Sequence, residues 1–87
     1  PMSAYTLRKR TSRSTGREFI EIWTDDRALI GRIADAISSA GQSEFYNSNG
    51  DDPGEYGVNL ETMKQVNTVA AVLGIDGDDL LDEAGIL

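Results

Sequence analysis

The clearest helical pattern of the chain is the stretch Thr24–Gly41, TDDRALIGRIADAISSAG. Its apolar residues recur at three- and four-residue spacing, which places them in one stripe along a helix. Thr24 or Asp25 can cap the first turn, and Gly41 stands where a left-handed C-terminal cap is expected. The apolar run Phe19–Trp23 leads directly into this stretch, so the sequence predicts a strand and a helix that pack together. The stripe consists of Leu29, Ile30, Ile33, Ala34, Ile37 and Ala40.

The residues before this helix predict an antiparallel β-hairpin. One strand is Ala4–Arg10, in which Tyr5, Leu7 and Lys9 alternate with the polar and basic residues of an outer face. The other strand is Arg17–Thr24, which is rich in β-branched and aromatic residues. Between them lies a polar turn, Thr11–Gly16. Both faces of the second strand are partly apolar, which is typical of a central strand or of one covered on both sides. These two alternatives stay open.

Two more helices are predicted in the second half of the chain. Asn59–Gly74 has helical spacing of its apolar residues, and Asn59 is a good N-cap. Asp76 then precedes a short acidic helix, Gly77–Ala84. Together, the residues Leu60–Gly85 resemble the last two helices of lambda-repressor-like helix-turn-helix domains, and this resemblance implies DNA binding by the segment before them.

That preceding segment, Gln42–Gly57, is acidic and rich in turn residues. Pairing of Ser43–Asn47 with Glu55–Val58 would make a second hairpin, and an ordered loop fits the same residues. The segment contains no lysine or arginine, whereas a recognition helix needs cations and amides near phosphates and base edges. DNA binding is therefore not transferred from the resemblance to this chain.

These patterns predict one small α+β domain over residues 2–87. An N-terminal antiparallel β-hairpin, which a second short hairpin can extend, packs against two main helices and a short C-terminal helix. A chain of 87 residues is long enough for one core. Pro1 is interpreted as a residue left by tag removal, with Met2 as the natural start. The expected core consists of Leu7, Phe19, Ile20, Ile22, Leu29, Ile33, Ile37, Val66, Val69, Leu73, Leu80 and Leu81.

The composition argues against catalysis and metal binding. The sequence contains no histidine and no cysteine, which removes the commonest general base, thiolate nucleophiles and the usual zinc ligands. Asn47–Asp52 has a partial likeness to a calcium loop, but Phe45 and Tyr56 would occupy positions that need oxygen donors. We therefore expect a non-enzymatic protein without a metal or other cofactor. A membrane-spanning helix needs about 20 consecutive apolar residues, and no stretch of the sequence comes close to that length. We therefore expect a cytoplasmic protein with no membrane contact.

Charge is distributed unevenly along the chain. Residues 1–32 carry seven basic and four acidic side chains, whereas residues 33–87 carry one basic and eleven acidic ones. Such asymmetry indicates a charged partner, and solubility alone is the alternative explanation. The predicted acidic docking residues are Asp51, Asp52, Glu55, Asp76, Asp78, Asp79, Asp82 and Glu83.

Two functions are compatible with this distribution. The favoured hypothesis is a small protein-binding module whose acidic surface docks on a basic, nucleic-acid-handling protein or nucleoprotein complex in place of nucleic acid. Small acidic inhibitors that phages and mobile elements use against host nucleases or CRISPR-type complexes have this general character. The alternative is a nucleic-acid-binding regulator, which the net charge of −7 disfavours. Self-association of the basic hairpin with the acidic surface is compatible with both. The alternative basic site consists of Arg8, Lys9, Arg10, Arg13 and Arg17.

Overall fold

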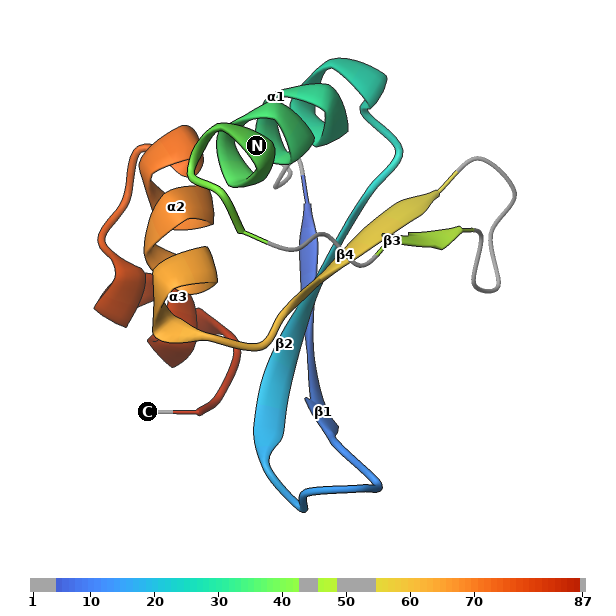
Figure 1. Cartoon of the computed structure of the whole chain (residues 1–87), viewed down its shortest axis with the longest axis vertical. Helices are drawn as coiled ribbons and strands as arrows, with labels where there is room; N and C mark the ends of the chain where they lie inside the picture. The colour runs from blue at the N-terminus through green and yellow to red at the C-terminus, as the bar shows by residue number, and fades with distance from the viewer. Residues whose placement is uncertain (1–4, 43–45, 49–54, 87) are drawn as a thin grey trace.

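The computed structural model describes residues 5–42, 46–48 and 55–86 of the chain. These residues form one antiparallel sheet with the strand order β1-β2-β4-β3, and three helices pack on one side of it (Figure 1). The predicted α+β fold class is therefore confirmed. The elements are β1 (Thr6–Thr11), β2 (Glu18–Thr24), α1 (Arg27–Ser39), β3 (Tyr46–Ser48), β4 (Tyr56–Leu60), α2 (Met63–Leu73) and α3 (Gly77–Glu83).

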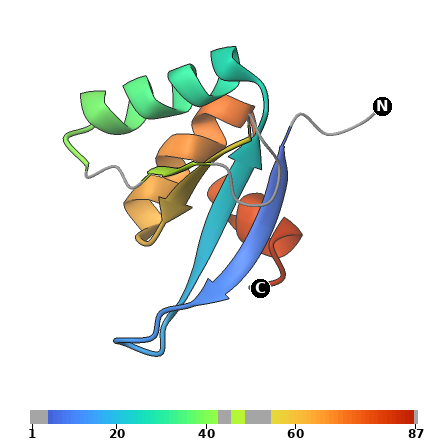
Figure 2. The ribbon, with the colours of Figure 1, turned by 90° about the vertical axis from the view of Figure 1, so that its right-hand side faces the viewer.

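The first hairpin agrees with its prediction. β1 and β2 pair along their whole length, from Thr6 opposite Trp23 to Thr11 opposite Glu18. In the turn, the N–H of Gly16 donates to the Ser12 carbonyl at 2.9 Å, and Gly16 has a φ of +70°, which glycine adopts without steric cost. β2 also pairs with β4, so it is a central strand. In Figure 2, α3 lies behind the two strands of this hairpin.

The second hairpin is present rather than an ordered loop. β3 pairs with β4, with Asn47 opposite Gly57, and places a fourth strand at the edge of the sheet. Ser43–Phe45 and residues 49–54, which belong to the predicted hairpin and its turn, lie outside the described residues.

Helix α1 begins later than the sequence pattern predicts. Asp26 is its N-cap, and the carboxylate accepts two backbone N–H groups of the first turn at 2.9 and 3.2 Å. The prediction of Thr24 or Asp25 as the cap is wrong, because Thr24 ends β2 and its hydroxyl accepts the N–H of Asp26 at 3.0 Å. The C-terminal prediction is confirmed, since Gly41 has a φ of +71°.

The predicted start of the second helix is also wrong. Asn59 and Leu60 belong to β4, where Leu60 is buried in the core. Helix α2 starts at Met63 with a capping box: the Thr62 hydroxyl accepts the N–H of Gln65, and the Gln65 side chain accepts the N–H of Thr62, both at 3.1 Å. A strand therefore precedes α2, and the resemblance to helix-turn-helix domains does not extend to this part of the fold.

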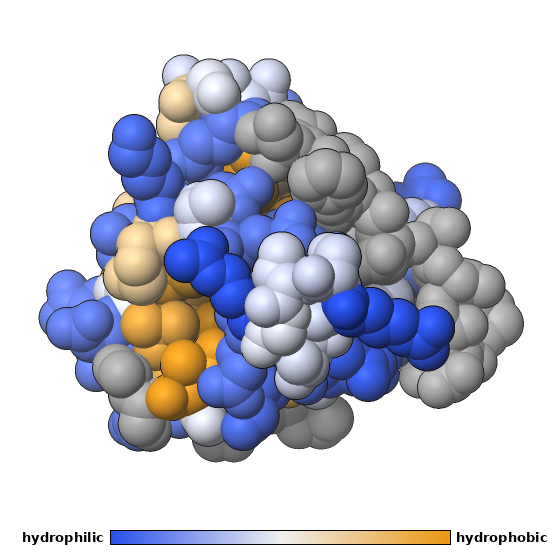
Figure 3. Space-filling model, turned by 60° about the horizontal axis from the view of Figure 1, so that its bottom comes forward, coloured by the Kyte–Doolittle hydropathy of each residue, from blue (hydrophilic) through white to orange (hydrophobic). Residues whose placement is uncertain are grey.

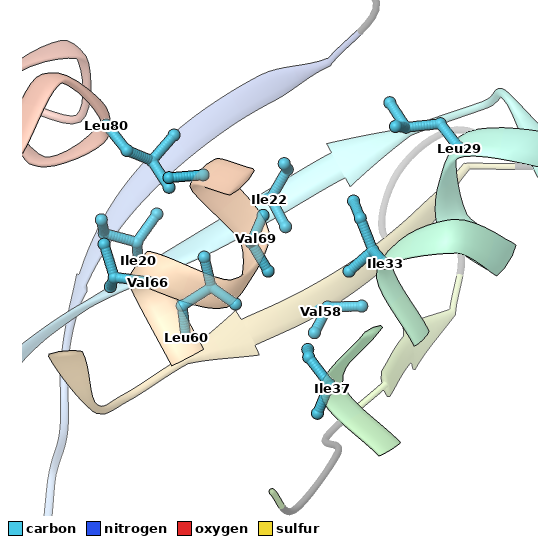
Figure 4. Packing of buried hydrophobic residues seen from close by; sticks show 11 residues of the cluster. Ile20, Ile22, Leu29, Ile33, Ile37, Val58, Leu60, Val66, Val69 and Leu80 are labelled. Carbon is cyan, nitrogen blue, oxygen red and sulfur yellow. The ribbon is translucent and has the colours of Figure 1, made fainter. Parts of the chain in front are cut away.

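The core lies between the helices and the side of the sheet that faces them (Figure 4). It agrees with the sequence prediction for two thirds of the expected residues, and Leu7, Leu73 and Leu81 pack against it from the periphery. Expected core residues that are only half-buried are Leu7, Phe19, Leu73 and Leu81. Buried residues outside the expected core set are Trp23, Val58, Leu60 and Ala70. The hydrophobic cluster consists of Ile20, Ile22, Leu29, Ile33, Ile37, Val58, Leu60, Val66, Val69, Ala70 and Leu80.

Candidate protein-binding surface

The side of the sheet that faces away from the helices, here called the open face, is organised around Trp23. The indole lies flat on Gly57, where an added Cβ would stand 2.7 Å from the ring. The guanidinium of Arg8 stacks over the ring at 5.0 Å from its centroid, and the indole N–H donates to Glu21 at 3.1 Å. These contacts leave Trp23 only 5 % exposed, so it supports the sheet and does not present an aromatic surface for recognition.

The same face pairs two cations of β1 with carboxylates. Arg8 lies 3.6 Å from Glu55, and the Nε of Arg10 donates to Glu21 at 2.9 Å. The side chain of Glu55 is 19 % exposed, so its charge is largely committed to Arg8. Glu55 was predicted as part of the acidic docking surface, and the structure places it on the open face, away from the acidic helix.

The other predicted basic residues lie elsewhere. Lys9 projects to the opposite side of β1 from its neighbours, where its Nζ lies 3.4 Å from Glu18 and 3.5 Å from the Gly85 carbonyl. Arg13 and Arg17 are exposed at the end of the hairpin, and neither forms an ion pair with a described residue. The five cations of the alternative basic site are thus divided among two sides of the sheet and the hairpin end.

Helix α3 and its N-cap residue carry a group of acidic side chains that we call the α3 acidic face: Asp76, Asp78, Asp79 and Asp82. All four are exposed, and none forms an ion pair with any residue in the described part of the chain. Asp78 and Asp79 lie in the first turn, where the helix dipole favours negative charge. Asp78 and Asp82 are four residues apart, so they lie side by side on the helix and repel each other.

Glu83 of the same helix is exposed as well, and unlike the four aspartates it has a hydrogen-bond partner outside the helix. Its carboxylate accepts a long hydrogen bond from the Tyr5 hydroxyl, at 3.4 Å. Burial raises the pKa of Tyr5, and the negative charge of Glu83 raises it further. Glu83 therefore contributes to the attachment of α3 beside β1. Of the other predicted acidic residues, Asp51 and Asp52 lie outside the described residues.

An apolar groove of about 220 Å³ opens beside α3. β2 pairs with β4 only from Ile20 onward. Glu18 and Phe19, the first two residues of β2, therefore have no partner in β4, because the chain leaves the sheet after Leu60 and turns into α2. The groove lies at this place. Ile20, Leu60 and Val66 form its buried floor, Phe19 and Leu81 line its sides, and Met63 stands at its rim with 48 % exposure. Figure 3 shows this hydrophobic area next to hydrophilic side chains.

This groove has no counterpart among the features predicted from the sequence. Phe19 and Leu81 belong to the expected core, and Met63 falls within the predicted helix Asn59–Gly74. The sequence feature that could have indicated the groove is the capping box formed by Thr62 and Gln65. It shows that α2 begins after Leu60, which places Met63 in the first turn of the helix, beside the end of β4. Glu18 and Glu61 flank the groove.

Metal binding and membrane spanning were the two other possibilities that the described residues can test. No group of three or more acidic side chains within them is placed to hold a metal ion. None of their helices has the length and apolar character needed to cross a lipid bilayer. Comparison with known proteins found no matching family model, no matching curated protein and no matching solved structure.

Proposed function

We propose that the chain is a non-enzymatic protein-binding module, and that its α3 acidic face docks on a basic, nucleic-acid-handling protein or nucleoprotein complex. One observation carries this proposal. The cations of β1 are paired within the domain, whereas the carboxylates of the α3 acidic face have no ion pair with a described residue. Exposed, uncompensated charge of one sign steers a partner of the opposite sign and raises its association rate.

The partner class follows from what such a surface can replace. Proteins that hold nucleic acid do so largely by attraction between cations and phosphates. Exposed carboxylates grouped at one short helix offer the same sign of charge to the same cations, so the α3 acidic face would act as a competitor of nucleic acid. This mode of action is that of a small inhibitor from a phage or mobile element, and it would place the protein in the cytoplasm.

A charge-matched pair of variants tests the proposal. Asp78→Asn with Asp82→Asn removes two charges from the α3 acidic face, and Asp25→Asn with Asp35→Asn removes two exposed charges from the neighbourhood of α1. The immobilised chain, incubated with a nuclease-treated extract of the source cell or its host, is expected to capture basic nucleic-acid-handling proteins. Moderate salt and added duplex DNA should release them, because both compete for the same cations.

The α3 pair should lose this capture, and the α1 pair should keep it. If both pairs capture the same proteins with the same salt response, the α3 acidic face is not the docking surface. Circular dichroism of each variant establishes that the loss does not come from unfolding.

The alternative function, nucleic-acid binding through the hairpin, is supported by one observation: Arg13 and Arg17 are exposed and have no ion pair with a described residue. In a mobility-shift titration we expect no binding of DNA or RNA tighter than about 10⁻⁴ M at physiological salt, the weak end of non-specific affinity. Micromolar binding that disappears in Arg13→Ser with Arg17→Ser would favour the alternative. Self-association of the hairpin end with α3 would appear instead as salt-sensitive dimers in sedimentation experiments.

A further inference from the structure

The apolar groove beside α3 is shaped to receive one side chain. Its floor is formed by residues that are already buried in the core, so the cavity is part of the folded domain. An apolar cavity of about 150 Å³ can hold a benzene molecule. The groove, at about 220 Å³, therefore has room for one large aliphatic or aromatic side chain of a partner.

The rim of the groove is held in place by the start of α2. The side chain of Gln65, which is buried, accepts the N–H of Glu61 at 2.8 Å and that of Thr62 at 3.1 Å. These bonds fix the backbone that carries Met63 and Glu61. A preorganised rim loses little conformational entropy when a ligand binds, so more of the contact energy appears as affinity.

The charges around the groove indicate what should stand next to that apolar side chain. Glu61 is exposed at the rim and has no ion pair with a described residue, whereas Glu18, which also lines the groove, is paired with Lys9 at 3.4 Å. On α3, Asp78 precedes Leu81 by three residues, so it neighbours the groove on the helix surface. Arg17 lines a second, more polar cavity, which shares Glu18, Phe19 and Glu61 with the groove.

We propose that the groove binds a segment of the protein partner in which one large apolar side chain is flanked by lysine or arginine. The apolar side chain fills the groove, and the cation lies between Glu61 and Asp78. This inference rests on the proposed function, because it concerns the same docking surface and specifies the chemistry of the partner segment that this surface recognises. The competing occupants are a second copy of the chain and an apolar segment without basic residues.

Selection from a library of random displayed peptides tests the inference without knowledge of the natural partner. The enriched peptides are expected to share a large apolar residue next to lysine or arginine. In synthetic versions, replacement of the apolar residue by serine should weaken binding about tenfold or more, because burial of one such side chain is lost. Replacement of the basic residue by glutamine should weaken binding at low salt and have less effect at high salt.

Variants of the chain locate the binding site. Met63→Arg puts a cation at the rim of the groove, and the exposure of Met63 makes the change compatible with folding. Ala71→Arg is the matched control, because Ala71 is also exposed on α2 but lies eight residues, about 12 Å, farther along the helix. The selected peptides should bind the Met63 variant at least about tenfold more weakly than the Ala71 variant.

Each failure of this test has its own meaning. Peptides that bind both arginine variants equally, yet are weakened by Asp78→Asn with Asp82→Asn, overturn the groove and leave the acidic docking surface standing. Peptides that need their apolar residue but ignore both salt and the Asp78 and Asp82 changes overturn the acidic docking function, and the cationic specificity with it. Absence of any enriched peptide overturns the groove proposal. Dimers of the chain that Met63→Arg abolishes would assign the groove to a second copy.

Discussion

The two sides of the sheet are stabilised by different means. On the side that faces the helices, aliphatic residues such as Ile22, Ile33 and Val69 pack together with no exposed surface. On the open face, one aromatic residue is buried by a glycine beneath it and an arginine above it. The difference shows that a sheet in a small domain can protect its second side without a second layer of helices, provided that an aromatic ring lies flat and a long polar side chain covers it.

The largest effect is expected at the covered side. Ile33→Ala should lower the free energy of unfolding by about 2–5 kcal/mol, because Ile33 is 0 % exposed and its removal leaves a cavity between α1 and the sheet. Urea unfolding measures this loss. Ile30→Ala makes the same chemical change on the same helix at a half-buried position, so its loss should be clearly smaller. Equal losses would mean that α1 does not pack through the Ile33 stripe.

A smaller effect is expected at the open face. Gly57→Ala should lower the free energy of unfolding by about 1–3 kcal/mol, because the new Cβ would stand less than 3 Å from three ring atoms of Trp23 and the ring must move. Gly31→Ala is the control, since nothing lies within 4 Å of a Cβ there and the position is helical. It should raise the free energy of unfolding by about 0.5–1 kcal/mol. If Gly57→Ala also stabilises the domain, Trp23 is not clamped against the sheet.

The smallest effect concerns Tyr5, which joins the edge of the covered side to α3. Its pKa is raised above the ordinary 10.0, first by burial and then by Glu83. The stabilisation that goes with this raised pKa is therefore complete below about pH 10 and is lost as the pH rises further. The reason is that the Tyr5 hydroxyl loses its proton more readily in the unfolded chain than in the folded one. The stability difference between the wild-type chain and Tyr5→Phe, measured by urea unfolding, should be constant below about pH 10 and shrink as the pH rises above it.

Glu83→Gln provides the companion measurement for Tyr5. It removes the negative charge that raises the pKa of Tyr5 further, and it leaves the burial of the ring unchanged. Part of the loss of stability at alkaline pH should therefore remain in this variant. An unchanged pH dependence in both variants would show that Tyr5 does not sense its position beside α3.

The parts of the fold that depend on local pattern could be predicted from the sequence. The spacing of Leu29, Ile33 and Ile37 defines α1, and alternation with β-branched residues defines the first hairpin. The start of α2 could not be read from apolar spacing alone, because Leu60 fits the helical stripe as well as it fits the core side of β4. Its place was decided by pairing with β2, a contact between residues far apart in the sequence.

The candidate site was predictable only in part, for a similar reason. The α3 acidic residues stand close together in the sequence, and the structure keeps them on one short helix. Arg8 and Glu55 are 47 positions apart, and their ion pair depends on the register of three strands. The same is true of the apolar groove, which depends on where β4 ends relative to β2. Such features arise from tertiary pairing and leave no mark in local composition.

The strand order also has a consequence for the order of folding events. β1 and β2 meet across a short turn, whereas pairing of β2 with β4 joins residues such as Ile20 and Leu60 and closes a loop that contains all of α1. Closure of a longer loop costs more chain entropy before any contact repays it. We expect the hairpin and α1 to gain structure early, and the docking of β4 against β2, with α2 following directly behind, to be the step that limits the folding rate.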